Sequence, residues 1–261
     1  MSEWETLNKE VTSLRKQGRY DRAVVVAKKA LAVAEKAGGR DHPDVATSLN
    51  NLAALYKTQG QYAQAEPLYT RSLAILEKAL GPEHPDVATS LNNLAFLYDT
   101  QGQYAQAELL YTRSLAINKK ALGPNHPAVA QSLNNLADLY HTQDEFAQAE
   151  RLYKRSLAIV EKALGPEHPD VATSLNNLAL HYVDRGKYAQ AESLYTRSLA
   201  INKKALGPNH PDVAQRLNKL AELCLANGQF AQAKLLLKRS LAIVEKALGP
   251  EHPDVATSLN N

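Results

Sequence analysis

Histidine is the first residue type whose spacing could do chemistry, because six His-Pro pairs recur every 42 residues along the chain. The histidines are His42, His84, His126, His168, His210 and His252. Zinc needs about four ligands within roughly 2.0–2.3 Å of the ion. Histidines one repeat apart in a stack of helix pairs are separated by roughly 20 Å, since packed helices lie about 8–10 Å apart. We therefore expect no metal site and no cofactor, and expect these histidines to begin helices.

The single cysteine, Cys224, is the only thiol that could act as a nucleophile. It stands where the other four full copies of the repeat have tyrosine, which predicts a buried and inert thiol. A nucleophile needs an activating base in an exposed, electropositive setting, and His181 lies in another copy. No glycine-rich phosphate loop follows a predicted strand. The sequence therefore predicts that the chain is not an enzyme.

Charge and hydropathy exclude two further classes of partner. The chain has 30 basic and 27 acidic residues, interspersed along its length, and no basic run of the kind that follows nucleic-acid phosphates. The pairs Lys119-Lys120 and Lys203-Lys204 suit the C-terminal ends of helices. No stretch reaches the 18 or so apolar residues of a membrane span. With one cysteine and no signal-like N-terminus, we expect a cytoplasmic chain that binds neither nucleic acid nor membrane.

The elements that must position all these residues come from an internal repeat. Five full copies of one 42-residue template occupy 43–84, 85–126, 127–168, 169–210 and 211–252; a degenerate copy occupies 1–42, and a partial copy 253–261. Copies ending in EKALGPEH alternate with copies ending in NKKALGPNH, so a second period of 84 residues overlies the first. The repeats continue without a Gly- or Ser-rich linker. We expect a single elongated domain over 1–261.

Each copy has the pattern of two helices. Apolar residues over 43–58 and again over 62–80 follow the spacing of one helical face. Gly60 can provide a left-handed turn between the helices, and Gly81-Pro82 ends the second helix. His84, which precedes a proline, suits the N-cap of the next helix. One helix pair cannot bury its apolar face alone, so the copies must stack into an all-α solenoid.

The residues Leu49, Leu52-Ala53, Tyr56, Gly60, Tyr62, Ala65 and Tyr69 resemble the tetratricopeptide signature, although that repeat is usually 34 residues long. The 42-residue length, the LNNLA motif and the LGPEHPDVA motif resemble the repeats of kinesin light chains and of their prokaryotic look-alikes. The resemblance implies a right-handed superhelix of tandem helix-turn-helix hairpins, whose concave groove holds an extended peptide or a partner surface. The sequence lacks the heptad region of a complete light chain. The residues predicted to line the groove carry both signs of charge, which gives little support for a preference for acidic peptides.

In kinesin light chains the asparagines of the LNN motif, on the first helix of each copy, contact the backbone of the bound peptide. The matching residues are Asn50 and Asn51, Asn92 and Asn93, Asn134 and Asn135, Asn176 and Asn177, with Lys219 in place of the second asparagine in the last full copy. At about 100° per residue, Asn51 points away from the apolar direction of its helix. We expect the second asparagine to contact a ligand and the first to be structural.

Two positions near these asparagines change in every copy while the predicted core hardly changes. The first position holds Ala54, Phe96, Asp138, Leu180 and Glu222; the second holds Lys57, Asp99, His141, Val183 and Leu225. We interpret them as side chains that set specificity beside the constant asparagines. The alternative is that exposed positions drift without selection. The position of Pro67, on the second helix and away from the groove, is equally variable and supports this alternative.

The sequence thus predicts a non-catalytic scaffold that binds an extended peptide or a partner surface in the groove lined by the first helix of each copy. One alternative is self-assembly by end-to-end stacking, because the partial copy leaves Val255 and Leu259 without a partner helix. Another is a sensor or regulatory segment of a larger multidomain protein.

Overall fold

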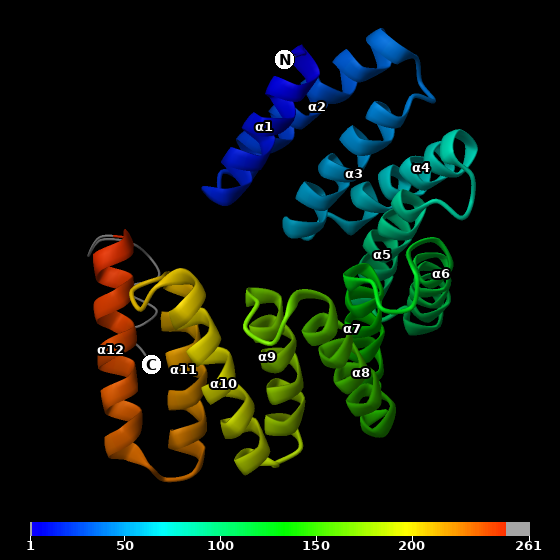
Figure 1. Cartoon of the computed structure of the whole chain (residues 1–261). Helices are drawn as coiled ribbons and strands as arrows, with labels where there is room; N and C mark the ends of the chain where they lie inside the picture. Colours follow the sequence, from blue (N-terminus) through cyan, green and yellow to red (C-terminus); the bar gives the residue numbers. More distant parts are fainter. Residues whose placement is uncertain (1, 249–261) are drawn as a thin grey trace. The chain divides into compact units, whose positions relative to one another are not determined.

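A computed structural model describes residues 2–248, and over these residues the chain is all helical (Figure 1). The helices are α1 (Glu3–Lys16), α2 (Tyr20–Gly38), α3 (Pro43–Thr58), α4 (Tyr62–Leu80), α5 (Pro85–Thr100), α6 (Tyr104–Leu122), α7 (Pro127–Thr142), α8 (Phe146–Leu164), α9 (Pro169–Asp184), α10 (Tyr188–Leu206), α11 (Pro211–Ala226) and α12 (Phe230–Leu248). The odd-numbered helix of each copy is called helix A below, and the even-numbered one helix B. The partial copy 253–261, with Val255 and Leu259, and His252 lie outside the described residues.

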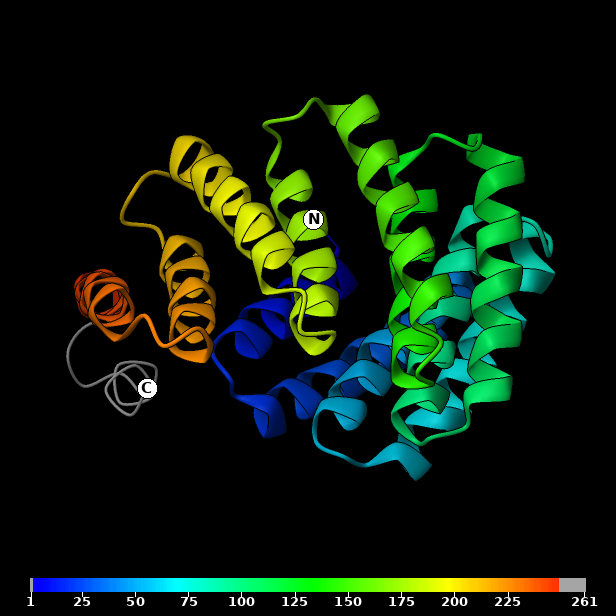
Figure 2. The ribbon, with the colours of Figure 1, turned by 90° about the horizontal axis from the view of Figure 1, so that it is seen from below.

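The helices divide into two compact units, Met1–Pro124 and Asn125–Asn261. Unit 1 contains α1 to α6, and unit 2 contains α7 to α12. In both units each helix packs most extensively against the other helix of its hairpin, and helix B then packs against the next helix A. Figure 2 shows α9, α10, α11 and α12 of unit 2 side by side in this order. The prediction of an all-α chain of stacked hairpins is confirmed.

Histidine begins helix A in each of the five full copies, as predicted. His42 has an extended backbone (φ −73°, ψ 143°), and its ring Nδ1 accepts the backbone N–H of Asp44 at 3.2 Å. The same bond recurs at His84, His126, His168 and His210. The ring therefore supplies the capping acceptor that serine or aspartate usually supplies. The sequence analysis predicted the backbone role but not this bond.

Glycine ends helix B at a backbone conformation that other residues avoid. Gly165 has φ 88° and ψ 154°, and Gly81, Gly123 and Gly207 have nearly the same angles. This region of positive φ with extended ψ is accessible essentially to glycine alone. The turn inside the hairpin is different: Gly60 has φ 72° there, and the equivalent Asp144 has φ 61°, so a residue with a side chain can occupy that turn.

Replacing Gly165 by alanine is therefore expected to destabilise unit 2 by about 1–3 kcal/mol. A Cβ at this position meets no atom within 4 Å, so the whole effect is attributed to the backbone. The matched control is Gly186→Asp, at the turn position where Asp144 stands one copy earlier. The loss of stability in this variant should be clearly smaller. Urea denaturation followed by circular dichroism measures both, and equal losses would contradict the assignment.

Small and apolar side chains fill the interior of both units. On helix A, Leu49 and Leu52 are buried, and on helix B, Ala65 and Tyr69 are buried. The hydroxyl of buried Ser72 donates to the carbonyl oxygen of Ala46 at 2.8 Å, which ties helix B to helix A. The same bond joins Ser114 to Ala88, Ser156 to Ala130, Ser198 to Ala172 and Ser240 to Ala214. Cys224 is buried, as predicted, and burial raises the pKa of its thiol.

Charged side chains join successive helices B on the outside of the hairpins. Arg71 pairs with Glu35 at 2.7 Å, Arg113 with Glu77 at 2.6 Å, and Arg197 with Glu161 at 2.6 Å. Lysine replaces this glutamate at Lys203, where burial, and secondarily the charge of Arg239, lowers the lysine pKa. Such partly exposed pairs contribute little stability each, about 0–1 kcal/mol. Within the described helices Arg71, Arg113 and Arg197 thus face glutamate, whereas Arg239 faces a lysine.

Candidate functional site

The candidate site is the surface formed by helices A within each unit, where the predicted asparagines and variable positions lie. The second asparagines Asn51, Asn93, Asn135 and Asn177 and also Lys219 are half-buried; the first asparagines Asn50, Asn92 and Asn176 are half-buried, and Asn134 is buried. At the first variable position Ala54 is half-buried, whereas Phe96, Asp138, Leu180 and Glu222 are exposed. At the second, Lys57, Asp99, His141 and Val183 are half-buried, and Leu225 is exposed.

In unit 1 the asparagines of successive copies bond to each other. The Asn51 side-chain nitrogen donates to the Asn8 oxygen at 3.0 Å, and Asn93 donates to Asn50 at the same distance. The second asparagine of one copy therefore joins its helix A to the helix A before it. The pattern of a single helix predicted the second asparagine only at a ligand and does not indicate this bond or the part played by Asn8.

In unit 2 the corresponding amide groups are used differently. Asn135 accepts a hydrogen bond from Gln131 on its own helix at 2.8 Å. The side-chain oxygens of Asn134, Asn176 and Asn218 are covered and, within residues 2–248, have no hydrogen-bond partner; the same holds for Asn92 in unit 1. A covered acceptor without a partner costs about 1–3 kcal/mol. Lys219 instead pairs with Glu222 on the same helix, at 2.8 Å.

Side chains at the variable positions contact a neighbouring copy in unit 1, and Asp138 contacts its own copy in unit 2. In unit 1 the Lys57 nitrogen lies 3.9 Å from the centre of the Phe96 ring, an arrangement in which the ring face attracts the cation. Burial lowers the pKa of Lys57, and Arg15 adds to this effect. Burial also raises the pKa of Asp99. In unit 2, Asp138 accepts a hydrogen bond from the Tyr153 hydroxyl.

A pocket of about 260 Å³ lies between α3, α4 and α5 of unit 1. Its lining residues are Ala46, Thr47, Asn50, Ser72, Leu76, Asp86, Thr89 and Ser90. The Ser90 hydroxyl is buried there and has no hydrogen-bond partner in the described part of the chain. An apolar cavity of about 150 Å³ is large enough to bind benzene, so this pocket can take one aromatic side chain. Asn50 was predicted from the sequence as a site residue, whereas the pocket was not predicted.

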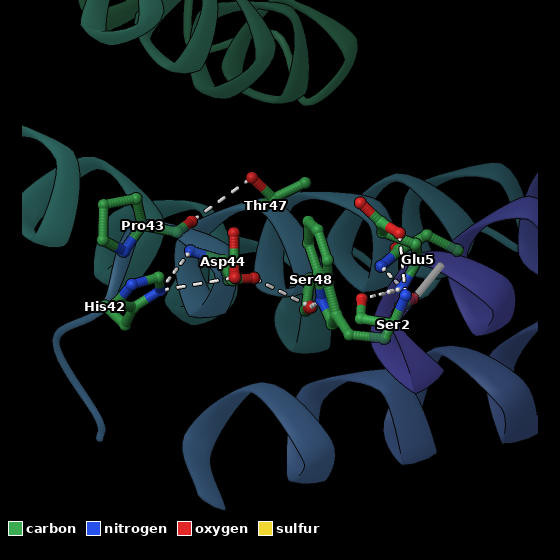
Figure 3. A network of polar contacts seen from close by, with 9 residues as sticks. Ser2, Glu5, His42, Pro43, Asp44, Thr47 and Ser48 are labelled. Carbon is green, nitrogen blue, oxygen red and sulfur yellow. Dashed lines mark hydrogen bonds and ion pairs between the residues drawn. The ribbon is translucent and has the colours of Figure 1, made fainter. Parts of the chain in front are cut away.

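The preceding copy shows what fills the equivalent space. Trp4 stands one repeat before Ala46, and its ring packs against the apolar cluster that includes Ala34 and Ala46. The indole N–H donates to the Ser48 hydroxyl at 2.8 Å, and Ser48 is the equivalent of Ser90. Figure 3 shows Ser48 in the polar network that also joins His42 and Asp44 at the start of α3. Ala46, which lines the pocket, thus stands where the preceding copy has the Trp4 ring.

Within 2–248, no three His, Cys, Asp or Glu side chains come together in an arrangement that could bind a metal ion. In the same range, none of the helices combines the length and the apolar character that a membrane span requires.

Comparisons with known proteins identify relatives of the repeats. A family model described as tetratricopeptide repeat matches residues 5–78, 57–120, 110–162, 143–204, 170–246 and 217–261. The crystal structure of BtubC (BKLC) from P. vanneervenii is similar over 95% of this chain and 94% of that chain, with 26% identity and a TM-score of 0.69. A putative kinesin light chain from Podosopora anserina with nearly identical TPR-like repeats is 33% identical over 79% of this chain and 98% of that chain, with a TM-score of 0.65. The apo form of RapI, 14% identical with a TM-score of 0.62, shares the fold.

Proposed function

Because the chain belongs to the tetratricopeptide repeat family, with repeats like those of kinesin light chains, we propose that its helix A surfaces hold an extended segment of a partner protein. Tetratricopeptide repeats generally serve as non-catalytic scaffolds for protein interactions. The proposal assigns backbone contacts to the asparagine pairs and specificity to the variable positions beside them.

The pocket between α3, α4 and α5 is the observation that supports this proposal best. It combines an apolar floor at Leu76 with a buried, unpartnered hydroxyl at Ser90. Binding sites for side chains commonly join an apolar cavity to a few polar groups that fix orientation. Trp4 bound to Ser48 is an internal example of a suitable occupant. We therefore infer that the partner segment places an aromatic side chain with an N–H or O–H group in this pocket.

The double variant Ala46→Trp/Leu76→Ala tests this function directly. It reproduces in the second copy the Trp4 and Ala34 pair of the first copy, so an internal side chain should occupy the pocket. Peptides selected from a displayed library of short unstructured sequences on the unaltered chain serve as the probe. We expect their affinity for the double variant to fall by about 30-fold or more, the loss typical of an interaction hot spot.

The matched control is Leu109→Arg on helix B, which is 71% exposed and has arginine, Arg151, at the same place one copy later. Its affinity for the selected peptides should be unchanged. Circular dichroism of all variants confirms that the helices persist. Selected peptides without an aromatic residue, or undiminished binding to the folded double variant, would show that this surface is not the binding site.

A further inference from the structure

One buried histidine in unit 2 takes no part in the surface described above. His181 on α9 stands where the other four full copies have a leucine, namely Leu55, Leu97, Leu139 and Leu223. The residue is 2% exposed. Its ring centre lies 5.2 Å from that of His141 and 5.7 Å from that of Tyr153. A titratable ring thus replaces an apolar side chain in the core between α7, α8 and α9.

A chain of hydrogen bonds joins this ring to the surface. His141 Nε2 lies 2.9 Å from a carboxylate oxygen of Asp184, and His141 Nδ1 lies 3.0 Å from His181 Nδ1. A carboxylate only accepts, so His141 must donate through Nε2 and accept at Nδ1. His181 must then donate through Nδ1 when both rings are neutral. Its Nε2 is left as a buried acceptor without a hydrogen-bond partner in the described part of the chain.

Charged and titratable groups lie near the pair on every element that packs against α9. They are Asp138 on α7, Glu150, Tyr153 and Lys154 on α8, Tyr182 and Asp184 on α9, Arg185 and Lys187 in the turn that follows it, and Tyr195 on α10. Glu150 is the carboxylate nearest to the free nitrogen, 4.0 Å from His181 Nε2. The Lys154 ammonium, with further hydrogen bonds from Lys187 and Tyr182, holds the pKa of Glu150 at about 2. Glu150 therefore stays ionised, and its carboxylate already has hydrogen-bond partners.

We propose that the His141–His181 pair is a pH-sensitive clasp between α7 and α9, closed when His181 is neutral and opened when His181 is protonated. A proton added at His181 Nε2 creates an imidazolium in a site that holds leucine in the other full copies, and its nearest carboxylate among the described residues, that of Glu150, is 4.0 Å away. A charge buried at this position weakens the contact between the two helices.

The electrostatics of the buried ring give the direction of the effect. Burial lowers the pKa of His181 below its ordinary value, and the nearby His141 acts in the same direction. The folded chain therefore binds fewer protons at this ring than the unfolded chain does. The contribution of neutral His181 to the stability of the folded chain is fully present above about pH 6.5, the unperturbed histidine pKa. This contribution is lost as the pH falls from there through the lower pKa of the folded state.

NMR of the unaltered chain tests the closed state without any variant. At about pH 7.5, well above the ordinary histidine pKa, the ring nitrogen shifts should report the Nδ1–H tautomer for His181 and the Nε2–H tautomer for His141. Detection of His181 in the Nε2–H tautomer would overturn the proposal, because that ring could not then donate to His141.

Thermal unfolding tests the opening. Between about pH 7.5 and about pH 5, which brackets the histidine range, the midpoint of the unaltered chain should fall more than that of His181→Leu. The expected difference is roughly 3–5 °C, the shift that a tenfold change in the folding equilibrium produces in a chain of this size. His168→Asn replaces a histidine outside this pair but keeps a capping acceptor, so it should behave like the unaltered chain. Equal pH dependence in His181→Leu and the unaltered chain would refute the clasp, and this result is independent of whether any partner binds.

Discussion

Truncation of Tyr69 to alanine is expected to destabilise unit 1 by about 3–5 kcal/mol, the usual cost of removing a large buried ring. Tyr69 is 1% exposed and packs in the unit 1 cluster with Val26, Leu52 and Leu94. This cluster combines residues of α1 to α5, so the cavity left by truncation would loosen contacts between copies as well as within one. Burial also raises the pKa of the Tyr69 hydroxyl to about 12, in agreement with its dry surroundings. Urea denaturation of the full chain measures the loss.

Tyr104→Ala is the matched control, because Tyr104 begins α6 in the same unit but is only half-buried. Its truncation removes the same atoms from a site that water already reaches, so the loss should be clearly smaller. A loss equal to that of Tyr69→Ala would mean that burial in the cluster does not determine the contribution of these tyrosines.

Replacement of Pro67 by arginine is expected to stabilise unit 1 by about 2 kcal/mol. Pro67 lies inside α4, where it lacks the N–H that would bond to the preceding turn, and proline costs about 3 kcal/mol in a helix interior. Proline also restricts the unfolded chain, which offsets up to about 1 kcal/mol of that cost. Arginine is a good helix former, and Arg151 occupies the same exposed position in α8. The midpoint of urea denaturation should rise.

The reciprocal variant Arg151→Pro provides the control in unit 2. It should destabilise α8 by a similar amount, because α4 and α8 have the same length of 19 residues and matching surroundings. If both variants leave stability unchanged, the helices absorb the missing bond by local adjustment, and the propensity argument is wrong for this position.

The helix pattern could be predicted closely because every full copy repeats the same start and stop signals. The predicted ranges 43–58 and 62–80 coincide with α3 and α4, and a His-Pro pair marks the start of helix A in each of the five full copies. Because the same pattern occurs five times, an error in assigning one copy can be recognised from the others. Local signals suffice here, because capping and termination depend on residues within one turn of the helix end.

The contacts between copies could not be predicted in the same way. The bonds Asn93–Asn50 and His141–His181 join residues about one copy apart, and the direction of a side chain on one helix does not say what its neighbour offers. Two signals were nevertheless present in the sequence. Trp4 against Ala46 indicates a missing ring, and His181 at a leucine position indicates a polar group in the core. Both are exceptions at otherwise constant positions, and in the structure both mark a local difference between copies.

The charges opposite the outer arginines have a consequence for how such a chain can change its length. Arg113 and Arg197 stand 84 residues apart and both face glutamate, whereas Arg239 stands 42 residues after Arg197 and faces Lys203. A gain or loss of two full copies keeps these pairings. Loss of the single copy-length segment 162–203 would instead place Arg239 opposite Glu161. Change by pairs of copies therefore preserves the charge that faces each of these arginines, and change by one copy can reverse it.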